Sequence, residues 1–484
     1  MRTKLLLSFL VILIPILNGA AQEIKTTWTL QECVDYAVAN NLNVKRSTYG
    51  VETNEVGYNL AWWALAPSFN AGVSNGYNWG RSINPVSYQY VTQRNNSINP
   101  NASSSVTIFN GLRLQYNIKQ TSRDLDASKA DLQKTKNDVI LNVISLYTNV
   151  IFNKELYEFS KSQLSSAQQQ LDRIIKQVNA GALSRSNQLN QEAQVATYEL
   201  NVVTRENSVN LTLLQLKQAL QLEAGVPMDV VIPDINVEEL VIDQNREEVF
   251  QQAYNTMPEI KRDNLKVESS DYAVRAARAN LYPRLSAGAN LNSNYSSVSD
   301  TRHFVADGGV IKDATQQIGT VDGTSTKVLS LPQDVNTGYY ANSYTEMQQI
   351  KDNLSKSVNL TLTIPILNGM QSRGTMQRAI INKEVALITA RQTSNTLRQS
   401  VETAFNDALA ASKTYASTMK QVNAREEANR MTKQRYESGA ANFVEYQLSE
   451  NDLFQAKSDF VRAKYDFIFK KKLLDFYQGK PIQY

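Results

Sequence analysis

The feature of this sequence that most constrains its fold is a pair of long stretches almost free of helix-breaking residues. Residues 112–224 contain no proline and a single glycine, Gly181, and residues 375–478 contain no proline and a single glycine, Gly439. Proline and glycine are the residues least compatible with a helix interior. Each stretch therefore predicts a long helix, a tight turn at the lone glycine, and a shorter helix that runs back alongside the first.

The first predicted helix, residues 112–180, would be roughly 100 Å long, which exceeds the depth of an ordinary globular core. Its second half has apolar residues at every seventh position, which is the spacing of a coiled-coil seam. These residues are Val143, Val150, Tyr157, Leu164, Leu171 and Val178. The rest of the helix is mostly polar, so we expect it to pack in a bundle with other helices.

The N-terminus has the pattern of a secretory signal peptide. Arg2 and Lys4 precede an apolar run over residues 5–17, and small residues follow up to Ala21. The run is too short to span a bilayer of about 30 Å. We therefore predict a signal peptide over residues 1–21 and an exported protein. Cys33 lies beyond the cleavage point and is the only cysteine, which argues against a lipid-bearing mature N-terminus and excludes an intrachain disulfide.

The composition argues against several functional classes. The net charge is +4 over 484 residues and the basic residues are scattered, so nothing points to nucleic acid. The only histidine, His303, lies in a segment of loop composition without the converging partners that a metal site or a catalytic triad needs. There is no glycine-rich loop to bind phosphate. We predict neither an enzyme nor a cofactor.

Alternating apolar and polar residues predict four β-strands, among them residues 68–79 and 103–109. The clearest strand, residues 358–367, has an apolar face made of Val358, Leu360, Leu362, Ile364 and Ile366. Ten residues with one apolar face suit a membrane-spanning strand of about 9 to 11 residues. Taken alone, this segment fits equally well an edge strand of a soluble sheet, with Pro365 on the unpaired side.

The sequence also contains a tandem repeat. Residues 248–253 match residues 32–37, and residues 283–288 match residues 67–72, in both cases 216 positions apart. Further on, Asn368-Gly369, Gly439 and Glu450 follow Asn110-Gly111, Gly181 and Glu192 at a distance of 258 positions. We therefore predict two repeats, residues 22–240 and 241–484, each with a small helix, a second helix, two strands and a helical hairpin. The second repeat has a longer loop between its strands, at about 299–345, which includes His303.

Four strands are too few to form a closed barrel. An open sheet would leave the backbone N–H and C=O groups of its edge strands without hydrogen-bond partners in lipid. Bacterial barrels begin at about eight strands, so three identical chains with twelve strands are the simplest closure. The helices would continue such a barrel as a ring around a water-filled tube.

These features resemble the TolC-type outer membrane efflux proteins over nearly the whole mature chain. The resemblance rests on the order of several short motifs, most of them present twice. They are the Thr29-Leu30-Gln31-Glu32 start, the segments 61–67 and 276–283 before the strands, Asn110-Gly111 and Asn368-Gly369, and the turn glycines that precede Glu192 and Glu450.

The resemblance implies an α+β membrane protein that is a homotrimer, with a 12-stranded outer membrane barrel, a periplasmic helical barrel and an equatorial belt. It also implies a passive exit duct of an efflux or type I secretion system, in contact with outer membrane lipid. An inner membrane pump would drive transport through a periplasmic adaptor docked on the two hairpin tips, residues 179–184 and 437–442. The docking residues would be Gly181, Ala182, Leu183, Gly439, Ala440 and Ala441.

The resembled family also suggests a periplasmic gate at the tips. Glu445 matches an acidic position that narrows the closed duct, whereas Leu448 stands where a second acid would follow. Tyr436 matches a tyrosine that ties the closed tip to the neighbouring hairpin, and Asn187 holds its partner's position. Ala441 replaces the family's basic latch residue. The alternatives are that Glu445 only favours a helix N-terminus and that Tyr436 only packs.

Two other classes compete with a duct. A secreted coiled-coil scaffold or adhesin would explain the helices but not the paired alternating strands. A general diffusion porin would share the barrel but has no use for roughly 100 Å of helix. The sequence leaves the cargo open, because a wide polar lumen selects little.

Overall fold

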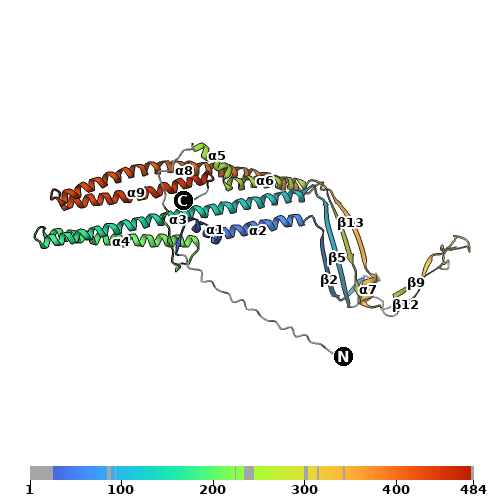
Figure 1. The fold of residues 1–484 in the computed structure, drawn as a ribbon. Helices are drawn as coiled ribbons and strands as arrows, with labels where there is room; N and C mark the ends of the chain where they lie inside the picture. Colours follow the sequence, from blue (N-terminus) through green and yellow to red (C-terminus); the bar gives the residue numbers. More distant parts are fainter. Residues whose placement is uncertain are drawn as a thin grey trace, which may run out of the picture. The chain divides into compact units, whose positions relative to one another are not determined.

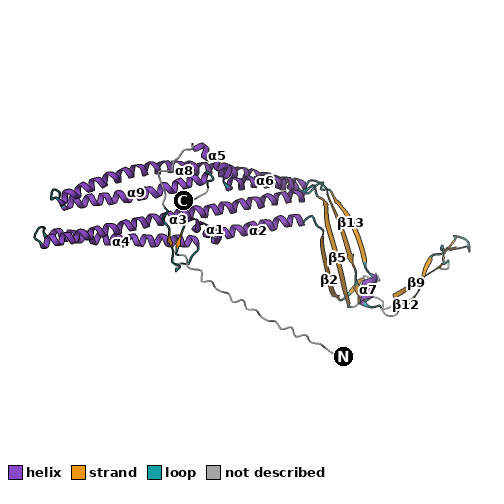
Figure 2. Cartoon of the chain, viewed as in Figure 1, coloured by secondary structure: helices purple, strands orange, loops and turns teal. Residues whose placement is uncertain are grey.

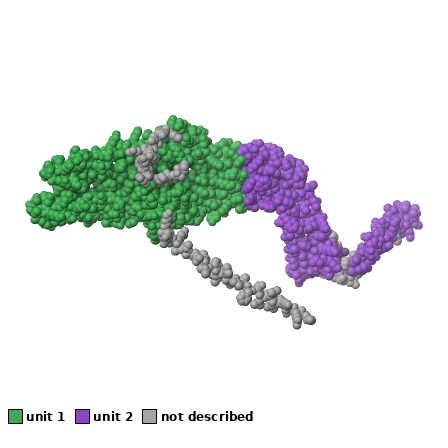
Figure 3. Space-filling view, viewed as in Figure 1, with its two compact units in different colours: residues 1–56, 121–270, 382–484 green, residues 57–120, 271–381 purple. Residues whose placement is uncertain are grey.

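The computed structural model describes residues 26–83, 89–92, 94–223, 225–233, 245–298, 303–312, 315–341 and 344–480. The predicted signal peptide lies outside these residues. The chain divides into two compact units (Figure 3). The helical unit comprises residues 1–56, 121–270 and 382–484, and the sheet unit comprises residues 57–120 and 271–381.

Both predicted helical hairpins are present (Figure 1). The long helices α3 and α8 have 67 residues each, so each is roughly 100 Å long. The helices are α1 (Leu30–Asn40), α2 (Leu42–Trp63), α3 (Arg113–Asn179), α4 (Arg185–Leu220), α5 (Arg246–Thr256), α6 (Pro258–Ala279), α7 (Glu346–Asp352), α8 (Gln371–Glu437) and α9 (Phe443–Tyr477). None of the helices described here is both long enough and apolar enough to cross a membrane.

The main sheet is antiparallel, with the strand order β13-β7-β5-β2 (Figure 2). Its strands are β2 (Ser68–Asn78), β5 (Asn95–Phe109), β7 (Arg284–Asn292) and β13 (Ser355–Thr363), and the short β8 (Tyr295–Ser296) pairs with β5. The register aligns Phe69 with Ser104, Ser104 with Ala289, and Ala289 with Val358, so their side chains share one face.

The two faces of this sheet differ in polarity. Because of the register, one face carries Phe69, Ala71, Val73, Ala102, Val106, Leu285, Ala287, Ala289, Leu291, Val358, Leu360 and Leu362, and we call it the apolar face. The other face carries Asn70, Asn101, Ser103, Ser286, Asn290, Asn359 and Thr361. In the single chain the apolar face is exposed, with Phe69 at 75% and Val358 at 82%. A soluble sheet would bury such a face.

The largest differences from the predicted strand boundaries are in β5 and in β13, which begins at Ser355 rather than at Val358. β5 begins at Asn95 rather than at Ser103, because its polar first half pairs with the far end of β2, where Gly76 lies opposite Ser97. β13 ends at Thr363 rather than continuing to residue 367, since Pro365 has no N–H to give to a ladder.

The segment expected to be a long loop contains regular structure. β9 (His303–Lys312) pairs with β12 (Asp334–Ala341), and β10 (Gln317–Thr320) pairs with β11 (Lys327–Leu329). His303, expected in a loop, is the first residue of β9. The glycines and aspartates that suggested a loop include Gly308, which has a φ of +86° in the middle of β9. Two further short pairs are β3 (Arg81–Ile83) with β4 (Tyr90–Thr92) and β1 (Thr27–Trp28) with β6 (Asp229–Val230).

The core of the helical unit surrounds the middle of α3. Val143 and Val150 are fully buried, as their seam positions predict, and they cluster with Leu216 of α4 and Ile468 of α9. Beyond Val150 the predicted seam residues Leu164 and Leu171 are half-buried and pack against a cluster of Ala167, Val195 and Tyr198. Tyr157 and Val178 are also half-buried, whereas Leu156, Ser160, Gln163, Ala167 and Ile174 are buried. Ser160, Ala167 and Ile174 lie three residues after Tyr157, Leu164 and Leu171, at the second contact position of the same heptads, so the seven-residue spacing continues with smaller or polar residues at some contacts.

In the same core, α3 contacts the paired strands β1 and β6, which come from the start and the middle of the chain. Tyr147 is 1% exposed, and its hydroxyl donates to the carbonyl oxygen of Val231 at 2.7 Å and also approaches that of Trp28 at 3.2 Å. The Lys154 Nζ contacts the Asp229 carboxylate at 2.7 Å. Cys33 is buried in this cluster, where burial and then the neighbouring Glu32 raise the pKa of its thiol to about 12. The thiol is therefore unreactive at neutral pH.

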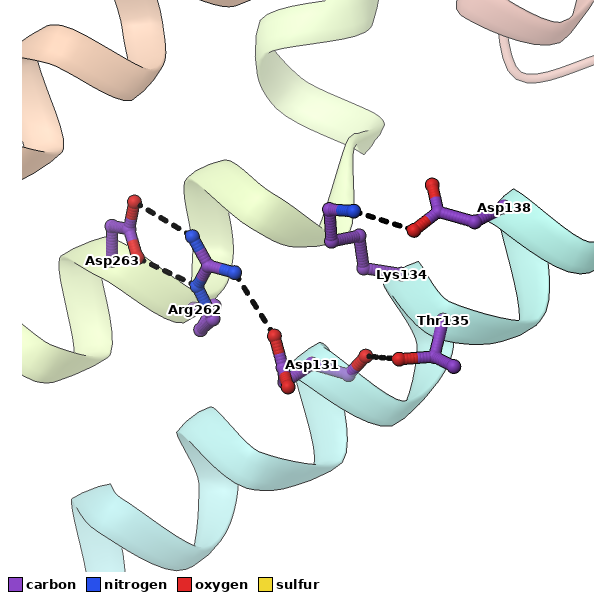
Figure 4. Close-up of polar contacts among 6 residues, drawn as sticks. All are labelled: Asp131, Lys134, Thr135, Asp138, Arg262 and Asp263. Atoms are coloured by element: carbon purple, nitrogen blue, oxygen red, sulfur yellow. Dashed lines mark hydrogen bonds and ion pairs between the residues drawn. The ribbon is translucent and has the colours of Figure 1, made fainter. Parts of the chain in front are cut away.

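An ion network around the buried Asp263 joins α6 to its neighbouring helices (Figure 4). The Arg262 guanidinium donates to Asp263 at 2.7 and 3.1 Å and to Asp131 of α3 at 2.9 Å. Asp263 is 6% exposed. Burial would raise the pKa of its carboxyl, but hydrogen bonds from Arg262 and from Thr393 of α8 outweigh burial and lower it. Asp263 is thus held as a carboxylate that links three helices.

Candidate functional site

The candidate site is the pair of hairpin ends, which we call the first tip (residues 179–184) and the second tip (residues 437–442). Both turns have the same geometry. Gly181 and Gly439 each have a φ of +74°, and the next residue donates its N–H back to the carbonyl oxygen of Gln177 or Arg435 at 2.8 Å. This is the Schellman arrangement. A Cβ at either glycine would meet open space, so the positive φ alone is what requires glycine.

The tips present small residues to solvent. Gly181, Ala182, Gly439 and Ala440 are exposed, whereas Leu183 and Ala441 are half-buried. The small side chains leave the turn backbone accessible, which suits close approach by another protein.

The second tip has an internal brace that the first lacks. Asn442 caps α9 by accepting the N–H of Glu445 at 2.8 Å. The Glu445 carboxylate in turn accepts from the Arg435 guanidinium at 2.7 Å, which joins the start of α9 to the end of α8. Ser184, the N-cap of α4, makes no such side-chain bond. The half-exposed pair adds at most about 1 kcal/mol, but it neutralises the charge of Glu445.

Aromatic rings pack just above the second tip. Tyr436 of α8 lies parallel to Tyr446 of α9, with ring centroids 5.3 Å apart and an interplanar angle of 7°, and Phe443 lies 6.1 Å from Tyr436. The hydroxyl of Tyr436 shares a hydrogen bond with Gln170 of α3. Tyr436 therefore packs within its own hairpin and also reaches the first hairpin.

Glu450 lies one turn beyond this stack. The Tyr446 hydroxyl donates to its carboxylate at 3.4 Å. Burial raises the pKa of the Glu450 carboxyl, and the opposing effects of Tyr446 and of Lys433 on α8 do not cancel it. Burial and the proximity of Glu450 likewise raise the pKa of Tyr446 and bring that of Tyr198 to about 12.

The two hairpins meet through α4 and α9 near these residues. The Tyr198 hydroxyl donates to Asn451 Oδ1 at 2.9 Å, and the Gln447 amide contacts Gln194. Further along the hairpins, Phe454 lies against Phe159, with ring centroids 6.4 Å apart. Farther still from the tips the contacts are also polar, since the Tyr465 hydroxyl of α9 donates to the Glu155 carboxylate of α3 at 2.5 Å.

The sequence identified part of this arrangement. It placed Gly181 and Gly439 in the tips, and Tyr436 and Glu445 beside the second tip, where the structure has them. It did not identify Tyr446 as the partner of Tyr436, or Arg435 as the partner of Glu445. Asn187 is half-buried in the first turn of α4, and Leu448 is 62% exposed on α9. The signal that was available for the stack was the placing of aromatic residues on both sides of the turn.

We expect acid to stabilise the packing at the second tip. Because the folded state raises the pKa of Glu450 above its ordinary value of 4.5, the carboxyl favours folding when protonated. This contribution is complete below pH 4.5 and is lost as the pH rises through the raised pKa. Glu450→Gln should therefore raise the protection factors for amide hydrogen exchange in residues 443–451 at pH 7.5 and remove the fall of these factors as the pH rises. Glu437→Gln, at an exposed carboxylate, is the control, and equal effects of the two changes would contradict the assignment.

The described part of the chain contains no group of three or more His, Cys, Asp or Glu side chains placed to hold a metal ion. The site instead offers small exposed turns, a neutralised carboxylate and an aromatic stack. These are features of a contact surface.

Known proteins with a similar sequence or fold are outer membrane transport proteins. A family model described as outer membrane efflux protein matches residues 34–221 and 249–471. The toxin and drug export protein A of Aggregatibacter actinomycetemcomitans is 21% identical over 288 residues, which are 58% of this chain and 60% of that protein. The match thus spans about 60% of the relative's length.

Solved structures share the fold at low sequence identity. The outer membrane protein VceC of Vibrio cholerae superposes with a TM-score of 0.70 at 12% identity, over 94% of this chain and 97% of its own. The Campylobacter jejuni CmeC outer membrane channel gives 0.70 at 16% identity, over 93% and 85%. The open state of the Neisseria gonorrhoeae MtrE outer membrane channel gives 0.65 at 16%, over 93% and 88%.

The family match covers most of the chain, and it confirms the expectation of a transport protein without enzymatic activity. This chain belongs to the outer membrane efflux protein family, whose members are passive channels of the outer membrane that extend into the periplasm.

Proposed function

We propose that this chain is one protomer of a homotrimeric exit duct in a tripartite efflux or type I secretion system. The observation that carries the proposal is the four-stranded sheet with one exposed apolar face and two open edges, combined with two helical hairpins about 100 Å long. Family membership favours a duct over a pore-less scaffold or adhesin.

The sheet geometry supports a shared barrel of twelve strands. β2 and β13 are the edges of the four-stranded path, and their free hydrogen-bonding groups need partners within lipid. Equivalent edges of two further copies would supply those partners. The apolar face would then meet lipid, and the asparagine-rich and serine-rich face would line the lumen. Phe69 and Tyr77 lie on one face of β2 and are roughly 26 Å apart, close to the height of the apolar band in such barrels.

The element order supports the proposed duplication into residues 22–240 and 241–484. The series α1, α2, β2, β5, α3, α4 recurs as α5, α6, β7, β13, α8, α9. Even the caps correspond, because Thr29 with Glu32 and Asn245 with Glu248 both form capping boxes. The duplicated hairpins of three chains would form the periplasmic helical barrel.

The tips would dock a periplasmic adaptor that links the duct to an inner membrane pump. The docking residues we propose are Gly181, Ala182, Leu183, Gly439, Ala440 and Ala441. The Aggregatibacter actinomycetemcomitans relative is named for toxin and drug export. We assign no single cargo to this duct, because a polar lumen selects little and the pump decides what enters.

Site-specific crosslinking tests the docking. With Cys33 buried and unreactive, Ala182→Cys and Ala440→Cys each introduce one accessible thiol per chain. A thiol-reactive crosslinker in living cells should join both variants to an adaptor. Leu200→Cys, at a position 65% exposed on α4, is the control. Trimers present in the outer membrane that yield no adaptor product from either tip would contradict docking.

Glu445 and Arg435 test the proposed gate. Three Glu445 carboxylates around the trimer axis would bind multivalent cations, but the Arg435 contact reduces their charge. Glu445→Gln should therefore weaken block of the channel by a trivalent cation, whereas Arg435→Gln should strengthen it. Single-channel conductance of the purified trimer measures both. If the block stays the same in both variants, Glu445 has no role in the gate.

Tyr436 and Asn187 are proposed as the second element of the gate. A hydrogen bond between them in the closed trimer would be neutral and would contribute about 1 kcal/mol. The packing of Tyr436 on Tyr446 supports a structural role beside this one.

A further inference from the structure

The short helix α7 packs against β8 and the residues that follow β7, beside the apolar face of the main sheet. It lies at the loop end of the strands (Figure 2). A groove of about 540 Å³ runs between helix and sheet, and Ala71, Val73, Ala102, Leu291, Ile350 and Leu354 line it. The first four of these residues come from three adjacent strands and belong to the apolar face. The groove is therefore continuous with the surface that we assign to lipid.

Polar contacts with the strand ends hold α7 in place. The Ser293 hydroxyl donates to the Ile350 carbonyl oxygen at 2.5 Å, and the Asn353 amide donates to that of Asn294 at 2.9 Å. Gln349 is 4% exposed and accepts the N–H of Ser296 at 3.2 Å. These hydrogen bonds, and not apolar packing alone, therefore fix the position of α7. Leu354 and Leu291 remain 46% and 44% exposed, so the groove stays open.

Basic side chains lie at the rim of the groove. Lys356 is exposed and directly opposite Leu291 in the sheet register, and the exposed Lys351 follows Ile350 on α7. Neither lysine forms an ion pair with a carboxylate of the described residues. The two acidic residues of α7 are already engaged, because Glu346 accepts a hydrogen bond from Tyr295 and Asp352 accepts one from Tyr344. Cationic charge is thus available beside an apolar groove.

We propose that this groove binds one acyl chain of a phosphorylated membrane lipid, whose phosphate lies at Lys356 and Lys351. A volume of about 540 Å³ falls within the range of small-molecule sites, roughly 300–1,000 Å³. Burial of an acyl chain in the groove is favourable because it removes apolar surface from water. Charge-assisted hydrogen bonds from two lysines, which pair with no carboxylate of the described residues, would stabilise the phosphate. α7 then acts as an interfacial helix that fixes one lipid against the barrel wall. The inference rests on the proposed placement of the sheet in the membrane.

Photo-crosslinking tests the site. The full-length trimer is reconstituted in liposomes that contain phosphatidylglycerol with a diazirine in one acyl chain, and adducts are mapped by peptide mass spectrometry. We expect the acyl chain to bury about two more methylene groups in the groove than on the open apolar face. The groove should then give about tenfold more adduct than Leu360 and Leu362 on the same face.

Two matched variants make the result specific. Ala71→Trp fills the groove and should bring its adduct down to the level of the rest of the face. Ala287→Trp makes the same change on the same face, outside the groove lining, and should leave the groove adduct unchanged. Lys356→Gln should reduce the groove adduct about threefold without changing that at Leu360. Recovery of trimers confirms that each variant folds.

The outcomes separate the lipid site from the membrane placement. Equal labelling of the groove and of Leu360, or a groove adduct that survives Ala71→Trp, would overturn the lipid site and leave the membrane placement intact. Absence of adducts from the whole apolar face would refute the placement, and the lipid site with it.

Discussion

Replacing Arg262 by methionine is expected to destabilise the helical unit by about 3 kcal/mol, the lower end of the cost of removing one partner of a buried ion pair. The Asp263 carboxylate would remain buried without its cation, and the link from α6 to Asp131 of α3 would be lost (Figure 4). We take the lower end because a quarter of the Arg262 side chain, 26%, is exposed. Urea unfolding of the purified protein, followed by circular dichroism, measures the loss.

A separate, exposed ion pair on α3 supplies the control. Lys134→Met removes the ion pair with Asp138 on the exposed surface of α3, where the two side chains are 38% and 58% exposed. Such a pair four residues apart contributes about 0.3–0.5 kcal/mol. The double variant Arg262→Met with Asp263→Leu should regain part of the stability, because no buried charge is left unpaired. Equal losses from Arg262→Met and Lys134→Met would show that the network is not buried in the native protein.

The pH dependence of this effect has a defined sign. The folded state lowers the pKa of Asp263 below its ordinary value of 3.8. The ionised Asp263 carboxylate therefore contributes to the free energy of unfolding above pH 3.8, and this contribution is lost as the pH falls through the folded pKa. In Arg262→Met, burial acts without the guanidinium and raises the pKa. The variant should therefore gain stability on acidification toward pH 4, opposite to the normal chain.

Replacing Leu360 by arginine is expected to cost about 2–4 kcal/mol, as for a cation at the lipid-facing midplane of an outer membrane barrel. Leu360 is 69% exposed on the apolar face of β13 and pairs with Ala287 in the middle of β7. In a single chain in water, such an exposed position would tolerate arginine. In a membrane it would not, because lipid cannot solvate the guanidinium. The yield and urea resistance of trimers in liposomes measure the effect.

Thr361 provides a matched control one residue away. Its side chain lies on the opposite, polar face of β13. Thr361→Arg should leave trimer stability nearly unchanged and should alter conductance instead, since the side chain would enter the lumen. If the two arginine variants behave alike, the face assignment of the whole sheet is wrong.

Much of the fold could be predicted because its strongest signals are local. The two helical hairpins follow from the absence of proline and from Gly181 and Gly439, whose positive φ is set within a few residues of the turn. The apolar face of β13 follows from strict alternation. The candidate tips could be located for the same reason, since each is a single turn between two strong helix signals.

The strand predictions were wrong where pairing with a neighbouring strand outweighed the local sequence pattern. β5 extends back to Asn95 because β2 offers a partner strand, although its sequence there is mostly polar. β9 and β12 pair within a segment of loop composition. The buried positions of α3 beyond Val150 include Ser160, Gln163 and Ala167, which a search for large apolar residues does not count.

The sequence by itself determined the types of element, their order and the turns between them, because backbone preferences act over a few residues. Only the tertiary structure decided which side chains meet. Arg262 reaches Asp131 across 131 positions, Glu445 pairs with Arg435 across the turn, and the groove beside α7 is lined by three strands from both halves of the chain. Such contacts depend on how packed helices and paired strands are aligned with one another. The sequence pattern within a single helix or strand does not determine that alignment.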